Sequence, residues 1–181
     1  MLFILLATLA LGLGAAGLVF IAGKLTGGAV PSWVAPAAGG LAMFAFMIWN
    51  EYTWYARAQA ALPPDSRIAQ VFEHRSPFQP WTLVAPRVVR FAAVNLRRRE
   101  LQGVLVGQVI LRERFQGERR LPHLFDCAGH RRAALSVAEW EGIGSGYPPL
   151  LETLDWIDAG AQDPLLSAAC NDGAPNPEDR P

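Results

Sequence analysis

Two long apolar segments begin the chain. Leu2–Ile21 runs for twenty residues without a charge, and Trp33–Trp49 runs for seventeen more. A helix rises about 1.5 Å per residue and a bilayer's hydrocarbon core is about 30 Å thick, so the first segment can cross a membrane. A cleaved signal peptide would start with basic residues, and Met1–Phe3 has none. We therefore predict that the first segment is a retained transmembrane helix.

The second apolar segment is shorter, but polar and aromatic residues extend it. Tyr52, Trp54 and Tyr55 follow it closely, and such residues are typical of the headgroup layer of a membrane. Residues 22–32, between the two segments, are rich in turn formers. We therefore predict a two-helix transmembrane hairpin, which puts both ends of the chain on one side of the membrane.

Small residues recur at four-residue spacing in both predicted helices, as Gly12 and Ala16 in the first and as Ala35 and Gly39 in the second. This spacing allows two helix backbones to approach closely in lipid. The small residues either pack the hairpin against itself or dock another membrane protein, and the sequence leaves both possibilities open.

Beyond the hairpin, Pro63-Pro64 ends the helical extension because proline has no N–H to donate. Short β-rich segments bounded by turn residues follow, which predicts an antiparallel β domain. In the clearest segment, Val104–Phe115, alternation puts Leu105 and Val109 on one face of a half-buried strand. The predicted strands are Ile68–Glu73, Val88–Leu96, Val104–Phe115, Leu121–Asp126, Ala133–Val137 and Leu150–Ile157.

A short helix and a polar tail complete the chain. Asp163-Pro164 is a typical helix start, and the helix should end near Cys170. The predicted fold class is a membrane α-helical hairpin followed by a small, mainly antiparallel β (α+β) domain with a short C-terminal helix. Its parts are the hairpin at 1–62, the β-rich domain at 63–170 and a disordered tail at 171–181.

Charge is segregated along the sequence, although 16 basic and 16 acidic residues cancel overall. Residues 87–132 hold eleven Arg against four acids, and residues 139–181 hold nine acids against one Arg. The two halves either neutralise each other across the sheet or leave a basic face that binds anionic lipid. The candidate lipid-facing residues, expected at strand connections, are Arg97, Arg98, Arg99, Arg119 and Arg120. No nucleic-acid partner is expected, because no recognised binding motif accompanies the charge.

Basic residues near the membrane predict the orientation of the chain. Lys24 lies between the two apolar segments, whereas Arg57 and Arg67 follow the second. The excess of positive charge after the second segment favours a cytoplasmic C-terminal domain. We therefore predict a two-helix membrane protein with a cytoplasmic C-terminal domain, with a periplasmic domain as the alternative.

One group of residues could carry chemistry. His123, Cys127 and His130 lie close in sequence, and zinc usually takes nitrogen and sulfur ligands. A packed thiol and two polar-face histidines explain the same residues, and a Cys127 nucleophile would need a paired base such as His130. The glycine-rich stretch 142–146 lacks the lysine of a phosphate-binding loop and predicts a flexible loop. No catalytic motif is complete and no cofactor is expected, so an enzyme is disfavoured.

Two resemblances add to these predictions. The segments Phe125–Cys127, Trp156–Gly160 and Ala168–Cys170 resemble the surface-adhesin protein E-like domain, a small exported β domain. That resemblance implies that Cys127 and Cys170 are paired, and a disulfide would be favoured only outside the cytoplasm. The whole chain, with Asn50–Trp54, is similar to uncharacterised two-helix bacterial membrane proteins, which imply no activity.

The leading functional hypothesis is an inner-membrane accessory protein, whose hairpin anchors a small β-rich domain that binds a protein partner or the lipid surface. The expected partners are membrane lipids and another membrane protein contacted through the hairpin. The alternative is an envelope structural or adhesin-like protein with an exported, disulfide-bonded domain.

Overall fold

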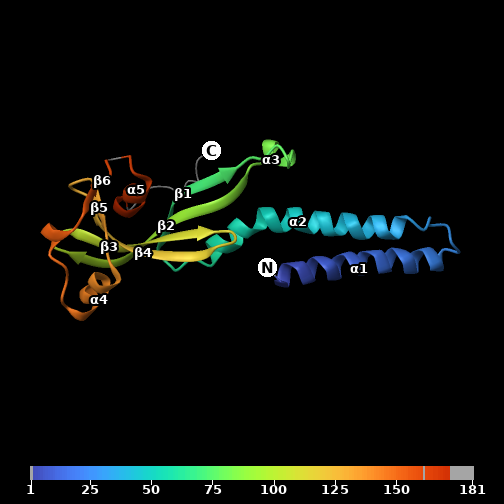
Figure 1. The fold of residues 1–181 in the computed structure, drawn as a ribbon, viewed down its shortest axis with the longest axis horizontal. Helices are drawn as coiled ribbons and strands as arrows, with labels where there is room; N and C mark the ends of the chain where they lie inside the picture. The colour runs from blue at the N-terminus through green and yellow to red at the C-terminus, as the bar shows by residue number, and fades with distance from the viewer. Residues whose placement is uncertain (1, 161, 172–181) are drawn as a thin grey trace. The chain divides into compact units, whose positions relative to one another are not determined.

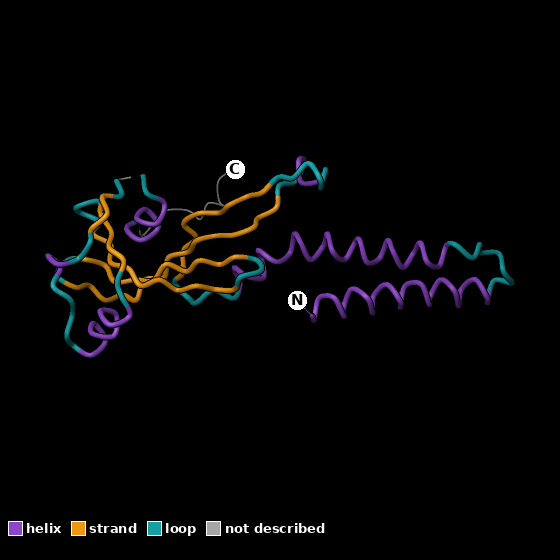
Figure 2. The backbone as a smooth tube through the Cα atoms, in the orientation of Figure 1, coloured by secondary structure: helices purple, strands orange, loops and turns teal. Residues whose placement is uncertain are grey.

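The computed structural model describes residues 2–160 and 162–171, except for the side chains of residues 97–99. The chain divides into two compact units, Met1–Ala56 and Arg57–Pro181. The first unit is helical and the second contains the β-sheet, an α+β arrangement (Figures 1 and 2). The predicted disordered tail at 171–181 lies outside the described residues except for Asn171.

The first unit is a pair of helices, α1 (Leu2–Leu25) and α2 (Val34–Ala60), of which the last residues of α2 belong to the second unit. The helices approach closely where the small residues meet. A Cβ atom added to Gly39 would lie 2.9 Å from the carbonyl oxygen of Gly12 and 3.2 Å from the Cβ of Ala16. The predicted close approach of the two backbones is therefore confirmed, and it packs the hairpin against itself.

The two helices differ in how well they suit a membrane. Within the described ranges, α1 is the one helix that is long and apolar enough to cross a bilayer. The second predicted span lacks this support, because Pro36, Asn50, Glu51 and Arg57 lower the mean hydropathy of α2. The sequence-based prediction counted the apolar core of α2 and gave too little weight to its polar second half.

Substitutions at Gly39 should separate the helices of the hairpin. Gly39→Leu places a side chain against the backbone of α1, whereas Gly40→Leu has no atom within 4 Å of its new Cβ. Both changes replace a helical glycine, so their effects on helix propensity cancel. A disulfide-free crosslinking assay between α1 and α2 in membranes should lose most of its signal in Gly39→Leu and keep it in Gly40→Leu. Equal crosslinking in both variants would contradict the observed packing.

The second unit is built on one antiparallel sheet in which each strand pairs with the next along the chain. The strands are β1 (Ser66–His74), β2 (Arg87–Leu101), β3 (Val104–Glu113), β4 (Gly117–Asp126), β5 (Arg131–Ala134) and β6 (Trp156–Asp158). Short connections keep β2 to β5 adjacent, whereas longer connections at residues 75–86 and 135–155 join the outer strand pairs. The helical segments are α3 (Trp81–Val84), α4 (Val137–Ser145), the 3₁₀ turn η1 (Leu151–Thr153) and α5 (Pro164–Cys170).

Tight turns set the register of the central strands. Gln102 and Gly103 connect β2 to β3 with φ angles of 52° and 85°, as a two-residue hairpin with positive φ at both positions requires. Residues 114–116 connect β3 to β4, with Gly117 at φ 81°. The predicted hairpin near Gly117 is confirmed, but β4 begins four residues earlier than the sequence pattern predicted.

The core lies on both faces of the sheet. One cluster joins Val94, Val109 and Phe125 to residues of α5, and the other joins Val106 and Leu124 to residues near α4 and η1. The prediction of a half-buried β3 is therefore wrong for its first half. Helices from the C-terminal part of the chain cover both faces there. Towards Glu113 the exposure is the reverse of the predicted one, because Leu111 is exposed and Arg112 is half-buried.

Two predicted strands are replaced in part by helices. Ser136 accepts a hydrogen bond from the backbone N–H of Glu139, and the Glu139 side chain bonds back to Ser136, which forms a capping box. The helix α4 therefore starts at Val137, inside a predicted strand, and covers most of the predicted flexible loop at 142–146. The predicted strand Leu150–Ile157 divides into η1 and the short β6.

Candidate functional site

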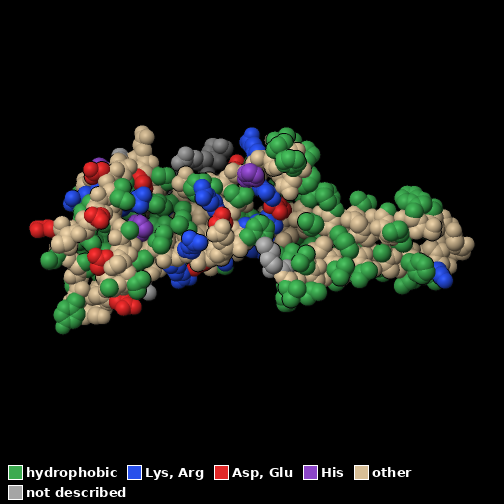
Figure 3. Space-filling view, viewed as in Figure 1, with side chains coloured by type: hydrophobic (Ala, Val, Ile, Leu, Met, Phe, Trp, Pro, Cys, Tyr) green, Lys and Arg blue, Asp and Glu red, His purple; other side chains and the backbone are tan. Residues whose placement is uncertain are grey.

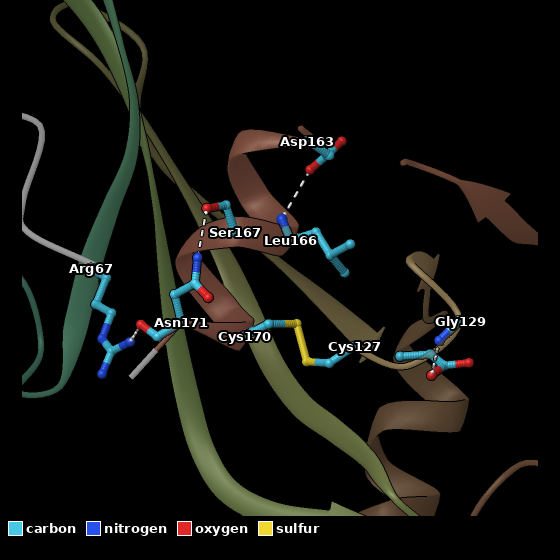
Figure 4. Close-up of a disulfide and its surroundings, with 9 residues drawn as sticks. Arg67, Cys127, Gly129, Asp163, Leu166, Ser167, Cys170 and Asn171 are labelled. Carbon is cyan, nitrogen blue, oxygen red and sulfur yellow. Dashed lines mark hydrogen bonds between the residues drawn. A yellow bond between two sulfur atoms is a disulfide. The ribbon is translucent and has the colours of Figure 1, made fainter. Parts of the chain in front are cut away.

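The clearest local structure in the second unit is the disulfide between Cys127 and Cys170, drawn in Figure 4. Cys127 follows the end of β4, and Cys170 is the last residue of α5. The two Cα atoms lie 5.7 Å apart, across a separation of 43 residues in sequence. The disulfide therefore fixes the end of the C-terminal helix to the turn that follows β4.

Local hydrogen bonds define both ends of α5. The carboxylate of Asp163 accepts hydrogen bonds from the backbone N–H groups of Leu165 and Leu166, each at 2.9 Å. At the other end, the guanidinium of Arg67 on β1 donates to the carbonyl oxygen of Asn171 (Figure 4). The predicted helix start at Asp163-Pro164 and its end near Cys170 are confirmed.

A second feature is the buried imidazole of His123 on β4. Its Nδ1 lies 3.1 Å from the carbonyl oxygen of Leu121, so Nδ1 is the donor and Nε2 is left facing Arg132 at 3.5 Å. Arg132 also lies 3.4 Å from the carboxylate of Asp163, which caps α5. The ring stacks on Phe125 with centroids 6.0 Å apart. His123, Arg132 and Asp163 thus form a polar connection between the sheet and α5.

Burial lowers the pKa of His123, and the positive charge of Arg132 adds to this effect against the raising influence of the Leu121 hydrogen bond. The histidine is therefore neutral in the folded domain near neutral pH. The side chain is buried, and its two ring nitrogens lie close to the Leu121 carbonyl oxygen and the Arg132 guanidinium. Neither nitrogen therefore faces an open site.

The turn after β4 holds a further ionic contact. The carboxylate of Asp126 accepts a hydrogen bond from the backbone N–H of Gly129 at 2.9 Å and pairs with Arg131 at 2.7 Å. These hydrogen bonds lower the pKa of Asp126, and the backbone contact has the larger effect. They shape the turn that carries Cys127 to its partner.

The predicted metal or nucleophile group does not assemble. Cys127 is bonded to Cys170, so it offers no thiolate to a metal or a substrate. His130 adopts φ 51° in the turn, and its carbonyl oxygen accepts from the N–H groups of Ala159 and Gly160. Within residues 2–160 and 162–171, no group of three or more His, Cys, Asp or Glu side chains is placed to hold a metal ion.

The predicted lipid-facing arginines are not at strand connections. Arg119 and Arg120 lie inside β4, exposed, and Arg120 pairs with Glu118 at 2.6 Å. Residues 97–99 lie inside β2, and their side chains are outside the described part of the structure. Arg99 pairs with Val106 near the start of β3, whereas Arg119 pairs with Leu111 near its end. The backbones of the two groups therefore lie towards opposite ends of β3.

No family model, curated protein or solved structure matches this chain. The resemblance to surface-adhesin protein E-like domains and to two-helix bacterial membrane proteins therefore stays a prediction.

A cavity of about 420 Å³ lies at the turn of the helical hairpin. Its walls include Phe20, Val30 and Pro31, and Lys24 is its one charged lining residue. The ammonium of Lys24 lies 5.4 Å from the Phe20 ring, so this charge already has an aromatic contact. The lining offers no set of polar groups that would orient a ligand.

The stability of the domain should fall as the pH decreases below 7. The pKa of His123 is lower in the folded than in the unfolded state, so unfolding takes up a proton below the ordinary histidine pKa of 6.5. One such group gives a slope of at most about 1.4 kcal/mol per pH unit. Urea titrations between pH 7.5 and about 5 should show this loss, and His123→Gln should reduce it. An unchanged pH slope in His123→Gln would contradict the role of burial.

Proposed function

We propose that this chain is an accessory protein of a bacterial inner membrane, whose helical hairpin anchors a disulfide-bonded, β-rich binding domain outside the cytoplasm. The observation that carries the proposal is the bond between Cys127 and Cys170 in a unit that follows an apolar helix. Disulfides persist in oxidising compartments and are rare in the cytoplasm. This compartment is the reverse of the one that Arg57 and Arg67 favoured in the sequence.

The charge near the membrane fits this orientation only at Lys24, because Arg57 and Arg67 would then lie outside the cytoplasm. In a hairpin with both ends outside the cytoplasm, Lys24 lies in the cytoplasmic connection, where basic residues are preferred. The role of α2 as a second span is part of the proposal. Its 27 residues are long enough to cross a bilayer, and Leu41, Phe44 and Met47 expose apolar side chains from its first half.

A binding role is proposed over catalysis because the reactive side chains are engaged in structural contacts. Cys127 forms a disulfide with Cys170. His123 hydrogen-bonds to the Leu121 carbonyl oxygen, and its ring stacks on Phe125. A partner protein or the lipid surface would contact the exposed parts of the sheet and its loops.

Anchoring can be tested with charges placed in α1. Leu9→Arg combined with Leu13→Arg puts two charges in the middle of the helix, at a cost of about 2.5–3.5 kcal/mol each at the bilayer centre. Leu25→Arg is the matched control, since an arginine at a helix end can reach the interface. The natural chain and the control should stay in membranes after alkaline carbonate extraction, at the full mass of 19.7 kDa, and a larger share of the double variant should be released. Release of a shortened natural chain would indicate a cleaved signal peptide and contradict the proposal.

An envelope structural or adhesin-like protein is the second candidate function. The observation that favours it is the disulfide between Cys127 and Cys170. The resemblance to surface-adhesin protein E-like domains implies the same pair. The two candidates differ in where the domain is accessible. Antibody binding to intact cells would favour the adhesin-like role, and binding only after the outer membrane is opened would favour the accessory role.

A further inference from the structure

Exposed apolar and basic side chains lie at one end of the sheet. His74 at the end of β1 pairs with Arg87 at the start of β2, and Glu113 at the end of β3 pairs with Gly117. Arg90 of β2 pairs with Glu113, so the connection 75–86 and the turn 114–116 lie at the same end. We call these two segments, together with Arg119 and Arg120 of the adjoining β4, the loop-end surface.

In the connection 75–86, the hydroxyl of Thr82 is buried, whereas the side chains of Phe78 and Val84 are exposed. Thr82 is fully buried, where its hydroxyl accepts from the N–H of Ser76 at 2.9 Å and donates to the carbonyl of Gln79 at 2.7 Å. Phe78 and Val84 are 93% and 89% exposed. Figure 3 shows apolar side chains gathered over α3, with basic side chains beside them. An ordered loop that buries a hydroxyl and exposes a phenyl ring is suited to an apolar environment.

The turn 114–116 also exposes an aromatic ring beside a basic side chain. Phe115 is 64% exposed, and the guanidinium of Arg114 lies 5.1 Å from its ring. Positive charge exceeds negative charge on both segments and their flanks. Residues 73–90 contain three Arg and one Glu, and residues 112–120 contain four Arg and two Glu. The loop-end surface is therefore apolar, aromatic and basic.

The end of α2 reaches this part of the second unit. The guanidinium of Arg112 donates a hydrogen bond of 2.9 Å to the carbonyl oxygen of Ala58, and Ala58 is buried. Along the chain, Ala58 comes three residues after the aromatic segment that ends at Tyr55. Within the second unit, Ala58 therefore lies at the same end of β3 as Phe115.

We propose that the loop-end surface binds the headgroup layer of the membrane that holds the hairpin, with a preference for anionic phospholipid. Phe78, Val84 and Phe115 insert among the headgroups, and Arg114, Arg119 and Arg120 contact phosphate. Aromatic side chains flanked by arginine are typical of membrane interfaces. This inference rests on the proposed membrane anchor and identifies which surface of the domain lies against the bilayer.

The experiment measures the depth of single fluorophores in the full chain. Because Cys127 and Cys170 are bonded to each other, Phe78→Cys and Phe115→Cys each provide one free thiol for labelling. Tyr147→Cys is the matched control, since Tyr147 is 83% exposed and follows α4, which packs near the opposite end of β3. The labelled chains are placed in vesicles of phosphatidylcholine with or without phosphatidylglycerol, and a quencher attached to the lipid headgroup reports contact.

We expect headgroup quenching at positions 78 and 115 to exceed that at 147 severalfold in vesicles with phosphatidylglycerol, and to fall when this lipid is omitted or salt is raised. Replacing Arg119 and Arg120 by glutamine should weaken the docked state about fivefold per residue. Equal quenching at all three positions, or quenching that ignores the anionic lipid, would overturn the inference. Unquenched labels at positions 78 and 115 would also overturn it, and a protein partner would then be the occupant to test. If the chain resists carbonate extraction but its labels are not quenched, this inference is refuted and the proposed membrane anchor is not.

Discussion

Removal of the disulfide should destabilise the β domain by about 3–4 kcal/mol. The Cys127–Cys170 bond closes a loop with a separation of 43 residues, and the loss of loop entropy in the unfolded chain sets this magnitude. Such a change is a large part of the 5–15 kcal/mol by which domains are usually stable. Pulse proteolysis in urea, on the full chain in detergent, should show a lower midpoint for Cys127→Ala/Cys170→Ala.

A reduced natural chain is the control for this variant. Reductant should lower the midpoint of the natural chain to that of the double variant and leave the variant unchanged. If the variant and the oxidised natural chain unfold at the same urea concentration, the disulfide does not stabilise the domain. The account of α5 as a helix held by this bond would then be wrong.

Phe125→Ala should have a comparable or larger effect, of about 3–5 kcal/mol. Phe125 is fully buried, packs with Val109 and Leu166, and pairs with Leu105 across the β3–β4 register. Truncation of its ring leaves a cavity between the sheet and α5. The free energy of unfolding should fall accordingly in the same urea assay.

Phe115→Ala provides a matched comparison, because this ring is on the surface of the same unit. Its effect on stability should stay within about 0.5 kcal/mol. If Phe125→Ala does not accumulate, Phe125→Leu keeps most of the volume and should cost less than about 1.5 kcal/mol. Equal effects of the two alanine variants would contradict the placement of Phe125 in the core.

The sequence predicts the fold best where local pattern decides the structure. The strands β1 to β4 follow from β-rich segments between turn residues, and α5 follows from Asp163-Pro164. The prediction fails around Val137, where apolar residues suggested a strand. The capping box between Ser136 and Glu139 favours a helix there, and this signal was present in the sequence.

Features that depend on distant contacts could not be predicted in the same way. Residues near α4 and η1 cover one face of β3 and α5 covers the other, so its burial does not follow simple alternation. Arg132 is near His123 because β5 pairs with β4, and Asp163 joins them only because α5 returns to the sheet. Likewise, Phe78 and Phe115 reach the same end of the sheet through strand register, which their separate sequence contexts do not indicate.

The central claim is that a disulfide-bonded domain lies outside the cytoplasm, and thiol labelling in intact cells tests it most directly. A thiol reagent that crosses the outer membrane but not the inner membrane is applied with and without prior reduction, then again after permeabilisation and denaturation. The account predicts that Cys127 and Cys170 are labelled in intact cells only after reduction. Labelling that needs inner-membrane permeabilisation and no reductant would place reduced cysteines in the cytoplasm and contradict it.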